Sequence, residues 1–521
     1  MTDAEPEIEP EVEQNFIEKY ENRKKSFEEF DSLIATMKRE LDEIQLDYKD
    51  RITSVMNQSM ASQFVPDELP NFIKKPYVII PAKRPDEWYV AVPKMINFFV
   101  GWLDYSDESY NVFKVNKFVN LLGEIPTELQ TKFKFKPKLP LQIYNGTLLT
   151  GVDHQEEAWA RYDKFLTRRE GKDKIKVKRG KEFDLIVSML NDGILPFSPK
   201  PVEAEDLRKP SNYPDWMKDL LAREYVKRAE EKFMEYGAIG VYWAFSAGKS
   251  VFGTYICDIL KGKKLVVVPT RTLVEQWKER LRKYTQAYHE TEVITYHSYH
   301  KVRNKEYVCV MFDEVHHLPA NTFSRFATIN AKYRLGYSGS VYREDGRTDM
   351  IFALTGYPVG LNWDNLIKLG IIEPPDIRVY IFTSGGNQAK IKHLQELLKI
   401  PKKTIIFCDE IALGKRLSSL IDAPFVFGQT TKRLETIKQS EVTVVSRVGD
   451  EGVSLPDIER VIEINFQFGS RRQEAQRMGR LFHGKSKGEH IVLMTEEELE
   501  KYGKRLLSIH DKGFKVEYVR V

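Results

Sequence analysis

The chain has 521 residues, of which 42% are hydrophobic and 30% are charged, and its formal net charge is only +4. This length predicts roughly three or four domains with packed cores. The small net charge excludes a uniformly cationic protein. Any surface for nucleic acid therefore has to come from local clustering of Lys and Arg.

The three cysteines lie far apart in apolar runs, at Cys257, Cys309 and Cys408, and form no CxxC or Cys/His ligand spacing. This pattern argues against a zinc site, an iron–sulfur cluster and a disulfide framework. The longest uncharged apolar run, 95–103, is too short to span a bilayer. We therefore expect no membrane partner, and a location in the cytoplasm, or in the nucleus if the source is eukaryotic.

Two different patterns follow one another at the N-terminus. Residues 1–13 alternate acids and prolines without a basic residue, which is typical of a disordered tail. Residues 14–58 carry apolar side chains at steps of three and four, without Pro or Gly, and predict one long helix. This near-heptad stripe packs either along its own protein or in a coiled coil with a partner chain.

Residues 65–205 predict an α+β accessory domain. The segments PYVIIPAK, EWYVAVPK and YNVFKVNKFV have the alternation of short strands. The run 164–181 holds nine basic and two acidic side chains. It is either a solvated loop or a contact with a phosphate backbone. The proline-rich stretch that follows has the composition of a linker.

From about residue 206 onward, short apolar runs alternate with charged segments of helical length. Buried parallel strands linked by helices have this texture. We therefore predict an α/β fold with two successive doubly wound parallel-sheet domains, at 206–375 and 376–521.

A phosphate-binding loop is predicted at WAFSAGKS, 243–250, between an apolar run and a helical one. In such a strand–loop–helix context, backbone N–H groups cradle phosphates. Lys249 is expected to reach the β- and γ-phosphates, and Ser250 to offer its hydroxyl to Mg²⁺. The strict GxxxxGK[ST] pattern is broken because Trp243 replaces its first glycine. The loop residues expected to bind ATP are Ser246, Ala247, Gly248, Lys249 and Ser250.

Two adjacent carboxylates end the apolar run VMFDEVHHLPA, 310–320. The carboxyl edge of a parallel sheet is where ligands bind. We expect Asp313 to hold Mg²⁺, directly or through water, and Glu314 to orient and polarise the attacking water. His316 is expected to relay the state of the phosphate to neighbouring elements.

Four arginines lie in GSRRQEAQRMGRLFHG, 469–484. Arg477 and Arg480 are three positions apart and share one face of a helix. A guanidinium delivered from a second domain stabilises the charge of a γ-phosphate transition state. The preceding loop, 448–457, is expected to touch both nucleotide and substrate. The two domains are then a clamp that closes on ATP.

These segments, taken in order over about 300 residues, resemble the motifs of superfamily 2 helicases. FSAGKS resembles motif I, PTRTLVEQW motif Ia, DEVHH motif II and YSGS motif III. TIIFCDE resembles motif IV, VGDEGVSLPD motif V and QRMGR motif VI. Within the superfamily, DEVHHLPA, the tripeptide RED and GSRRQEAQRMGR are similar to signatures of the XPB-like group.

The resemblance implies two RecA-like domains and ATP-driven translocation or strand opening on DNA. It implies further ATP contacts at Arg223, Tyr225, Asp450, Gly452 and Gln476. It implies nucleic-acid contacts at Pro269, Thr270, Arg271, Ser338, Ser340, Arg343, Glu344 and Asp345.

The sequence also departs from the family's pattern. Val226 replaces the glutamine that reads adenine, so base specificity is relaxed or adenine stacks on Tyr225 alone. Motif III has serines at both hydroxyl positions. His483 replaces the last arginine of motif VI, and a histidine has less reach and is often neutral at pH 7, so slow turnover is expected. No segment between the RED tripeptide and motif IV has room for the family's helical thumb.

Three functions remain open on the sequence alone. The first is an ATP-dependent DNA translocase, with ATP and Mg²⁺ as cofactors, that unwinds, anneals or remodels duplex or branched DNA. The second is a nucleic-acid clamp that uses ATP as a switch. The third is a motor subunit of weak intrinsic turnover, docked on a partner protein through residues 14–58. DNA, including single strands, is the expected polymer, and RNA is not excluded.

Overall fold

The structure is a computed structural model of the whole chain. It describes residues 78–82, 87–93, 102–106, 110–116, 129, 139–244, 247–339, 348–360, 367, 370, 373–430, 433–446, 457–467, 474, 477–483, 487–506, 509 and 514–521. The predicted acidic tail at 1–13 and long helix at 14–58 lie outside these residues. Within them, no helix has the length and apolar character that a membrane crossing needs.

Two antiparallel sheets precede the parallel ones, as the predicted α+β region requires. The first has the order β1-β2-β4-β3. Its strands are β1 (Val78–Pro81), β2 (Glu87–Pro93), β3 (Trp102–Ser106) and β4 (Tyr110–Asn116). The second has the order β5-β6-β8-β7 and carries two helices. Its elements are β5 (Gln142–Tyr144), β6 (Thr147–Leu149), α5 (Gln155–Tyr162), β7 (Leu166–Arg169), β8 (Lys174–Val177) and α6 (Glu182–Asn191).

The basic run at 164–181 is a strand hairpin, so its interpretation as a loop was wrong. Strands β7 and β8 pair antiparallel across it. Ile175 is fully buried and Val177 is 5% exposed, while Lys174 between the turn and the core stays exposed. The alternation of Lys with Ile and Val in KIKV is the period of a half-buried strand, and the high charge of the run concealed it.

The first parallel sheet has the order β11-β10-β12-β13-β9-β14, and every neighbouring pair is parallel. Its strands are β9 (Ala238–Tyr242), β10 (Lys264–Val268), β11 (Thr291–Thr295), β12 (Glu306–Asp313), β13 (Asn330–Tyr337) and β14 (Tyr357–Gly360). Its helices are α7 (Asp215–Leu221), α8 (Glu224–Tyr236), α9 (Lys249–Ile259), α10 (Arg271–Tyr284) and α11 (Thr348–Thr355).

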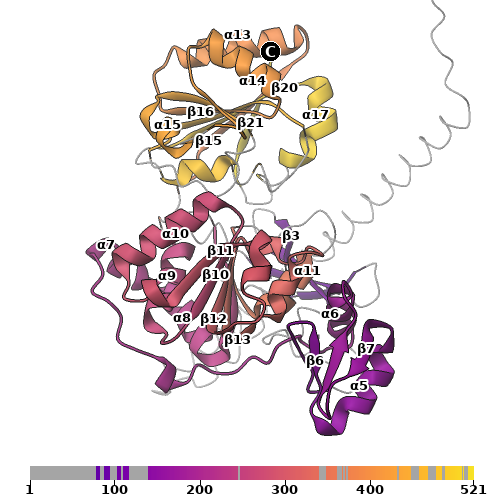
Figure 1. Cartoon of the computed structure of the whole chain (residues 1–521). Coiled ribbons are helices and arrows are strands. Elements are labelled where there is room, and N and C mark those ends of the chain that lie inside the picture. The colour runs from indigo at the N-terminus through magenta and orange to yellow at the C-terminus, as the bar shows by residue number, and fades with distance from the viewer. Residues whose placement is uncertain are drawn as a thin grey trace, which may run out of the picture.

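The second parallel sheet has the order β17-β18-β16-β19-β20-β15-β21. Its strands are β15 (Asp376–Phe382), β16 (Thr404–Cys408), β17 (Phe425–Val426), β18 (Val442–Val445), β19 (Arg460–Asn465), β20 (Glu489–Thr495) and β21 (Val516–Arg520). Its helices are α13 (Gly386–Leu398), α14 (Ile411–Leu420), α15 (Arg433–Gln439) and α17 (Glu496–Tyr502). The predicted fold of two tandem parallel-sheet domains is confirmed, and Figure 1 shows them as two lobes.

The N-terminal region packs directly on the first parallel sheet. Leu265 and Val267 of β10 share one apolar core with residues such as Phe113, Leu148 and Leu190. Their neighbours in the strand face the opposite way, into a second core with α8, α9 and α10, because side chains alternate across a strand. The second antiparallel sheet with α5 and α6, which we call the accessory module (139–198), therefore shares the apolar core on one face of the first sheet. Figure 1 shows the module beside the first parallel-sheet domain.

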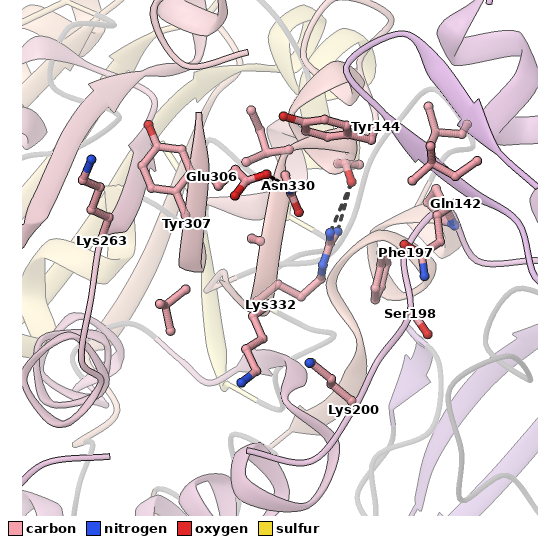
Figure 2. A pocket seen from close by; sticks show the side chains of 18 residues that line it. Gln142, Tyr144, Phe197, Ser198, Lys200, Lys263, Glu306, Tyr307, Asn330 and Lys332 are labelled. Carbon is pink, nitrogen blue, oxygen red and sulfur yellow. Dashed lines mark hydrogen bonds between the residues drawn. The ribbon is translucent and has the colours of Figure 1, made fainter. Parts of the chain in front are cut away.

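A cavity of about 730 Å³ lies where the accessory module meets the amino ends of β12 and β13 (Figure 2). Two of its cations are engaged within the protein. Lys332 forms ion pairs with Glu203 and Asp206. The buried Arg334 donates to the carbonyl of Ala327 at 3.3 Å, and its guanidinium lies 3.5 Å from the ring centroid of Phe197. The contact of Arg334 with Phe197 joins the module to β13.

Candidate active site

The predicted phosphate loop leaves the end of β9 and enters α9. Gly248 has a φ of 90° and stands immediately before the first residue of α9, Lys249. A side chain is excluded at Gly248 by this left-handed backbone and by Leu220, whose Cδ1 would lie 2.6 Å from an added Cβ. The free N–H groups of the helix start therefore point out of the loop, as binding of a phosphate group requires.

The ammonium group of Lys249 folds back onto its own loop. Its Nζ donates to the carbonyls of Trp243 at 3.0 Å and Ala244 at 2.8 Å. Burial lowers the pKa of Lys249 to about 8, and the carboxylates of Glu314 and Asp313 oppose that shift. The amine therefore lies within the electrostatic reach of both predicted catalytic acids.

Both acids lie at the carboxyl end of β12, in the middle of the sheet. Asp313 is the last residue of β12 and is 7% exposed. Glu314 follows in a left-handed conformation with φ 48°, and its N–H donates to Asp313 Oδ1 at 3.0 Å. This turn separates the two carboxylates, so that Asp313 stays in the sheet and Glu314 leaves it.

Trp277, which sequence reasoning missed, holds the Asp313 carboxylate. Its indole N–H donates to Asp313 Oδ2 at 2.8 Å, and the side chain is fully buried. Burial and the neighbouring Glu314 raise the pKa of Asp313 to about 6, against the opposing effects of Trp277, Arg280 and Lys249. The helical period of α10 predicts an inward-facing Trp277, but no sequence pattern predicts its polar partner.

His316 connects the acids to the end of β13. Its Nδ1 lies 3.0 Å from Ser338 Oγ and 3.3 Å from Glu314 Oε2, and the Ser338 hydroxyl donates to Glu314 at 3.2 Å. This triangle fits the relay predicted for His316. Ser338 is only 1% exposed, so the predicted contact of its side chain with nucleic acid is wrong, and its hydroxyl instead links motifs II and III.

Tyr225 braces the phosphate loop and offers little surface to a base. The Tyr225 hydroxyl donates to the carbonyl of Ala247 at 2.9 Å, and its ring packs edge-on against Trp243 at 4.9 Å. The side chain is 6% exposed, which contradicts adenine stacking on it. Val226 is buried in the same core, and the exposed Arg223 precedes α8. Trp243, which stands at the position of the pattern's first glycine, thus packs against Tyr225.

The residues of the predicted nucleic-acid track lie at the same sheet edge. Pro269 and Thr270 follow β10 and are half-buried, while Arg271 is exposed. Thr270 caps α10 by accepting the N–H of Leu273 at 3.3 Å. The N-terminus of α10 therefore faces outward beside the end of β12.

Arg477 is held by ion pairs inside the second domain, which does not favour its predicted role as a γ-phosphate finger. Its side chain is fully buried, and Nη1 donates to Glu463 at 2.6 Å. Its second nitrogen, Nη2, bonds Asp409. A guanidinium held by two buried carboxylates has no reach toward another domain. Arg480 is 9% exposed and stays the predicted finger.

Arg477 belongs to a buried network of ionic side chains, which we call the domain 2 ion network. Arg505 bonds Glu463 and Glu474, and His490 Nε2 lies 3.1 Å from Glu463 and 3.2 Å from Glu474. Burial alone lowers the pKa of His490, but these two carboxylates raise it to about 9. The three cations Arg477, Arg505 and His490 therefore balance Asp409, Glu463 and Glu474.

The cluster of Glu463, Glu474 and His490 has ligand atoms within 4.8 Å of one another, a spacing that a metal ion could bridge. The guanidiniums of Arg477 and Arg505 already bond these carboxylates. A divalent cation would meet two fixed positive charges there. We therefore assign the cluster to ion pairing.

Several predicted residues lie outside the described part of the chain. These are Ser246, Ser340, Arg343, Glu344, Asp345, Asp450, Gly452 and Gln476, together with the side chain of His483. The interval in which the thumb was expected to be absent, 346–403, is described at 348–360, 367, 370 and 373–403. The roles predicted for these residues stay predictions.

The chain is similar in sequence to known helicases. Residues 387–510 match the family model described as the ERCC3/RAD25/XPB C-terminal helicase. A putative DNA 3'-5' helicase Rad25 from Halobacterium salinarum is 30% identical over 348 residues, which cover 56% of this chain and 58% of that protein. The chain is a relative of the XPB-like helicases. The resemblance inferred from the sequence is thereby confirmed.

Similarity to the XPB-like group extends to other domains of life. A DNA 3'-5' helicase XPB from Kineococcus radiotolerans is 26% identical, over 51% of this chain and 58% of that protein. The XPB subunit of general transcription and DNA repair factor IIH from Drosophila melanogaster is 28% identical, over 55% of this chain and 45% of that protein. The chain thus spans only about half the length, 45% to 58%, of these three XPB-like relatives.

Proposed function

We propose that this protein is an ATP-dependent DNA helicase or translocase of superfamily 2, of the XPB-like kind, that unwinds, anneals or remodels duplex or branched DNA. The observation that carries the proposal is the convergence of Lys249, Asp313 and Glu314 at one sheet edge, with Lys249 in electrostatic reach of both acids. The names of the relatives support DNA as the polymer. The proposal puts the protein where DNA is, in prokaryotic cytoplasm or a eukaryotic nucleus.

The residues present fit a Mg²⁺–nucleotide. The left-handed Gly248 opens the start of α9 toward a phosphate, and the buried Asp313 is fixed by Trp277. We assign Lys249 to the β- and γ-phosphates and Ser250 and Asp313 to the metal. ATP supplies the free energy of the cycle when its terminal phosphate is hydrolysed.

The protein's own groups have separate tasks in this proposal. Glu314 orients a water molecule at the γ-phosphate. The hydrogen bond that its carboxylate accepts from Ser338 couples the position of that carboxylate to the end of β13. Arg480 approaches from the second domain when the domains close. The accessory module and the exposed edge at Pro269, Thr270 and Arg271 guide the DNA. We also propose that the successive regions of the chain begin at residues 14, 65, 206 and 376.

Steady-state ATP hydrolysis tests the proposal. The rate is measured without polymer and with single-stranded DNA, duplex DNA, a branched junction and RNA. We expect stimulation of at least about 10-fold by one DNA form. Lys249→Ala is expected to abolish hydrolysis, and Glu314→Gln to lower the rate about 10²-fold or more while ATP still binds.

A low rate that no polymer stimulates would contradict the motor. It would favour an ATP-switched clamp, or a motor subunit whose partner binds at residues 14–58. Deletion of 1–58 separates these two. A partner-dependent subunit keeps its basal rate but loses stimulation by its partner, whereas a clamp keeps its ATP-dependent affinity for DNA.

A further inference from the structure

A second cavity, of about 630 Å³, lies between the accessory module and the segments that follow β11 and β12 in the first parallel-sheet domain. The module contributes Lys176 and Arg179 to its lining, and the sheet domain contributes Arg303 and Arg325 from loops after β11 and β12. We call this cavity the seam groove. It is distinct from the cavity of Figure 2, which lies at the amino ends of β12 and β13.

The seam groove carries an excess of unneutralised positive charge. Its lining has four Lys and Arg side chains and one carboxylate, that of Glu182. Lys176 Nζ donates to the hydroxyl of Thr147 at 3.3 Å. Arg179, Arg303 and Arg325 form no ion pair with any part of the chain that the structure describes.

The rest of the basic hairpin is neutralised only in part. Arg168 pairs with Glu170 at 3.0 Å, and Lys181 pairs with Asp184 at 2.8 Å. Arg169 is paired with Glu156 of α5. Lys172 and Lys174 form no ion pair with a described residue, but they do not line the groove. Lys176 and Arg179 line the groove without a carboxylate partner among the described residues, so their charge is available to a ligand.

One end of the groove lies beside the predicted nucleic-acid track. Strands β10 and β11 pair in parallel with Val268 opposite Thr295. Pro269 and Tyr296 therefore leave the sheet side by side, and Tyr296 lines the groove. A polymer that lies along residues 269–271 is therefore next to the segment that forms this end of the groove.

One wall of the groove is bonded to the candidate active site. The buried Tyr296 donates its hydroxyl to the backbone carbonyl of Asp313 at 3.0 Å. The half-buried Tyr299 follows in the same turn, and its hydroxyl lies 3.4 Å from Thr328 Oγ1. The groove wall is thus a rigid extension of β12, whose last residue is the predicted metal ligand.

We propose that the seam groove binds the phosphate backbone of DNA and carries the track from residues 269–271 onto the accessory module. Arginine guanidiniums bind phosphate oxygens in a fork geometry, and backbone contact needs clustered cations without competing carboxylates. The groove meets both conditions. The proposal deepens the proposed function and rests on it for the identity of the polymer as DNA.

The salt dependence of DNA binding, measured without ATP, tests this proposal. The variant combines Arg179→Gln and Arg303→Gln, which removes one cation from each wall at exposed positions. Each lost phosphate contact lowers the slope of log K against log salt by about 0.9 for duplex and about 0.7 for single strands. We expect a slope shallower by about 1.8 for duplex and about 1.4 for single strands, and affinity lower on the order of 10-fold at 0.1 M salt.

The matched control combines Lys172→Gln and Lys174→Gln. These lysines are exposed on the same hairpin, and the variant has the same change in charge, but neither side chain lines the groove. We expect its slope to equal that of the parent protein. An unchanged slope in the groove variant, or equal losses in both variants, would overturn the proposal.

Crosslinking gives a second readout that does not depend on affinity. All three native cysteines are buried, so an introduced cysteine is the accessible thiol. Arg303→Cys is expected to react with DNA that carries thiol-reactive groups on its phosphates, and Lys174→Cys is not. Reaction at Lys174→Cys alone would overturn the proposal. If ATP hydrolysis is absent in the parent protein, the proposed motor fails, but these binding and crosslinking results still decide the groove.

Discussion

The indole N–H of Trp277 donates to Asp313 Oδ2 at 2.8 Å, and both side chains are buried at the centre of the first parallel sheet. The last residue of the segment that resembles motif Ia thereby fixes the acid that we assign to the metal. Tyr337 lies parallel to the indole at a centroid distance of 6.1 Å. The predicted active site is therefore supported from α10 and β13 as well as from its own loop.

Trp277→Phe tests this support through the pH profile of ATP hydrolysis. The phenyl ring keeps most of the packing but removes the donor that favours the ionised form of Asp313. The pKa of Asp313, already raised to about 6 by burial and Glu314, is expected to rise by roughly one unit, the equivalent of one hydrogen bond to a charged group. The acidic limb of the profile of kcat/KM should move to higher pH by that amount.

Trp216→Phe is the control, because Trp216 is 50% exposed and has no part in the site. Its pH profile should match that of the parent protein. If Trp277→Phe lowers the rate equally at every pH, the indole serves packing and not the ionisation of Asp313.

Asp313→Asn is expected to stabilise the protein at neutral pH while it abolishes hydrolysis. Since the folded-state pKa of Asp313 is about 6 and its ordinary value is 3.8, the folded protein binds this proton more tightly than the unfolded chain. Ionisation of Asp313 therefore lowers the free energy of unfolding as the pH rises from about 4 to about 6, and the loss persists at pH 7.5. The amide removes the charge and keeps an oxygen for Trp277.

Urea unfolding at pH 7.5 should show a gain on the order of 1 kcal/mol for Asp313→Asn, and a smaller gain at pH 5. Asp173→Asn, an exposed position in the hairpin turn, serves as the control and should change nothing. A lower free energy of unfolding for Asp313→Asn at pH 7.5 would mean that neighbouring groups stabilise the ionised Asp313 carboxylate more than its raised pKa indicates.

Arg477→Gln is expected to destabilise the second domain. The substitution leaves Glu463 and Asp409 buried with less compensating charge, and removal of one partner of a buried ion pair costs about 3–5 kcal/mol. Equilibrium unfolding in urea measures the loss. Arg480→Gln is the matched comparison, because we assign that residue to catalysis.

For Arg480→Gln we expect kcat to fall about 10³-fold, the low end of the effect of an arginine finger, with a smaller loss of stability. The opposite pattern, with Arg477→Gln stable but inactive, would restore Arg477 as the finger. It would require the domain 2 ion network to open when the domains close.

The fold and the motifs of the active site could be predicted from the sequence because they depend on local patterns. Continuous apolar runs predicted buried parallel strands such as β10 and β12, and the strand–loop–helix context of Gly248, Lys249 and Ser250 predicted a phosphate loop. The placement of Asp313 and Glu314 at the carboxyl edge follows from the polarity of a parallel sheet. Each of these inferences needs only neighbours along the chain.

The contacts that the sequence did not reveal join distant segments. Nothing near Trp277 indicates its bond to Asp313, 36 positions away. Arg477 was assigned to catalysis because an arginine in motif VI resembles a finger, whereas its partner Asp409 lies 68 positions away. The same limit concealed the seam groove, which needs a hairpin at 166–177 and a loop at 303 to come together.

The domain 2 ion network predicts a loss of stability at alkaline pH. Although burial opposes it, the carboxylates of Glu463 and Glu474 raise the pKa of His490 to about 9, compared with 6.5 in an unfolded chain. The folded state therefore retains this proton in a range where the unfolded chain has lost it. The stability that protonated His490 contributes is fully present below about pH 6.5 and is lost as the pH rises toward 9.

Urea unfolding between pH 6 and pH 9.5 should therefore show a decline on the order of 2 kcal/mol in the parent protein. His490→Gln removes the proton-linked charge, so its stability should be lower at pH 6 and vary less over this range. His289→Gln, at an exposed position, should behave like the parent protein. If His490→Gln declines as steeply as the parent protein, the network does not depend on a protonated His490, and its two glutamates are balanced by Arg477 and Arg505 alone.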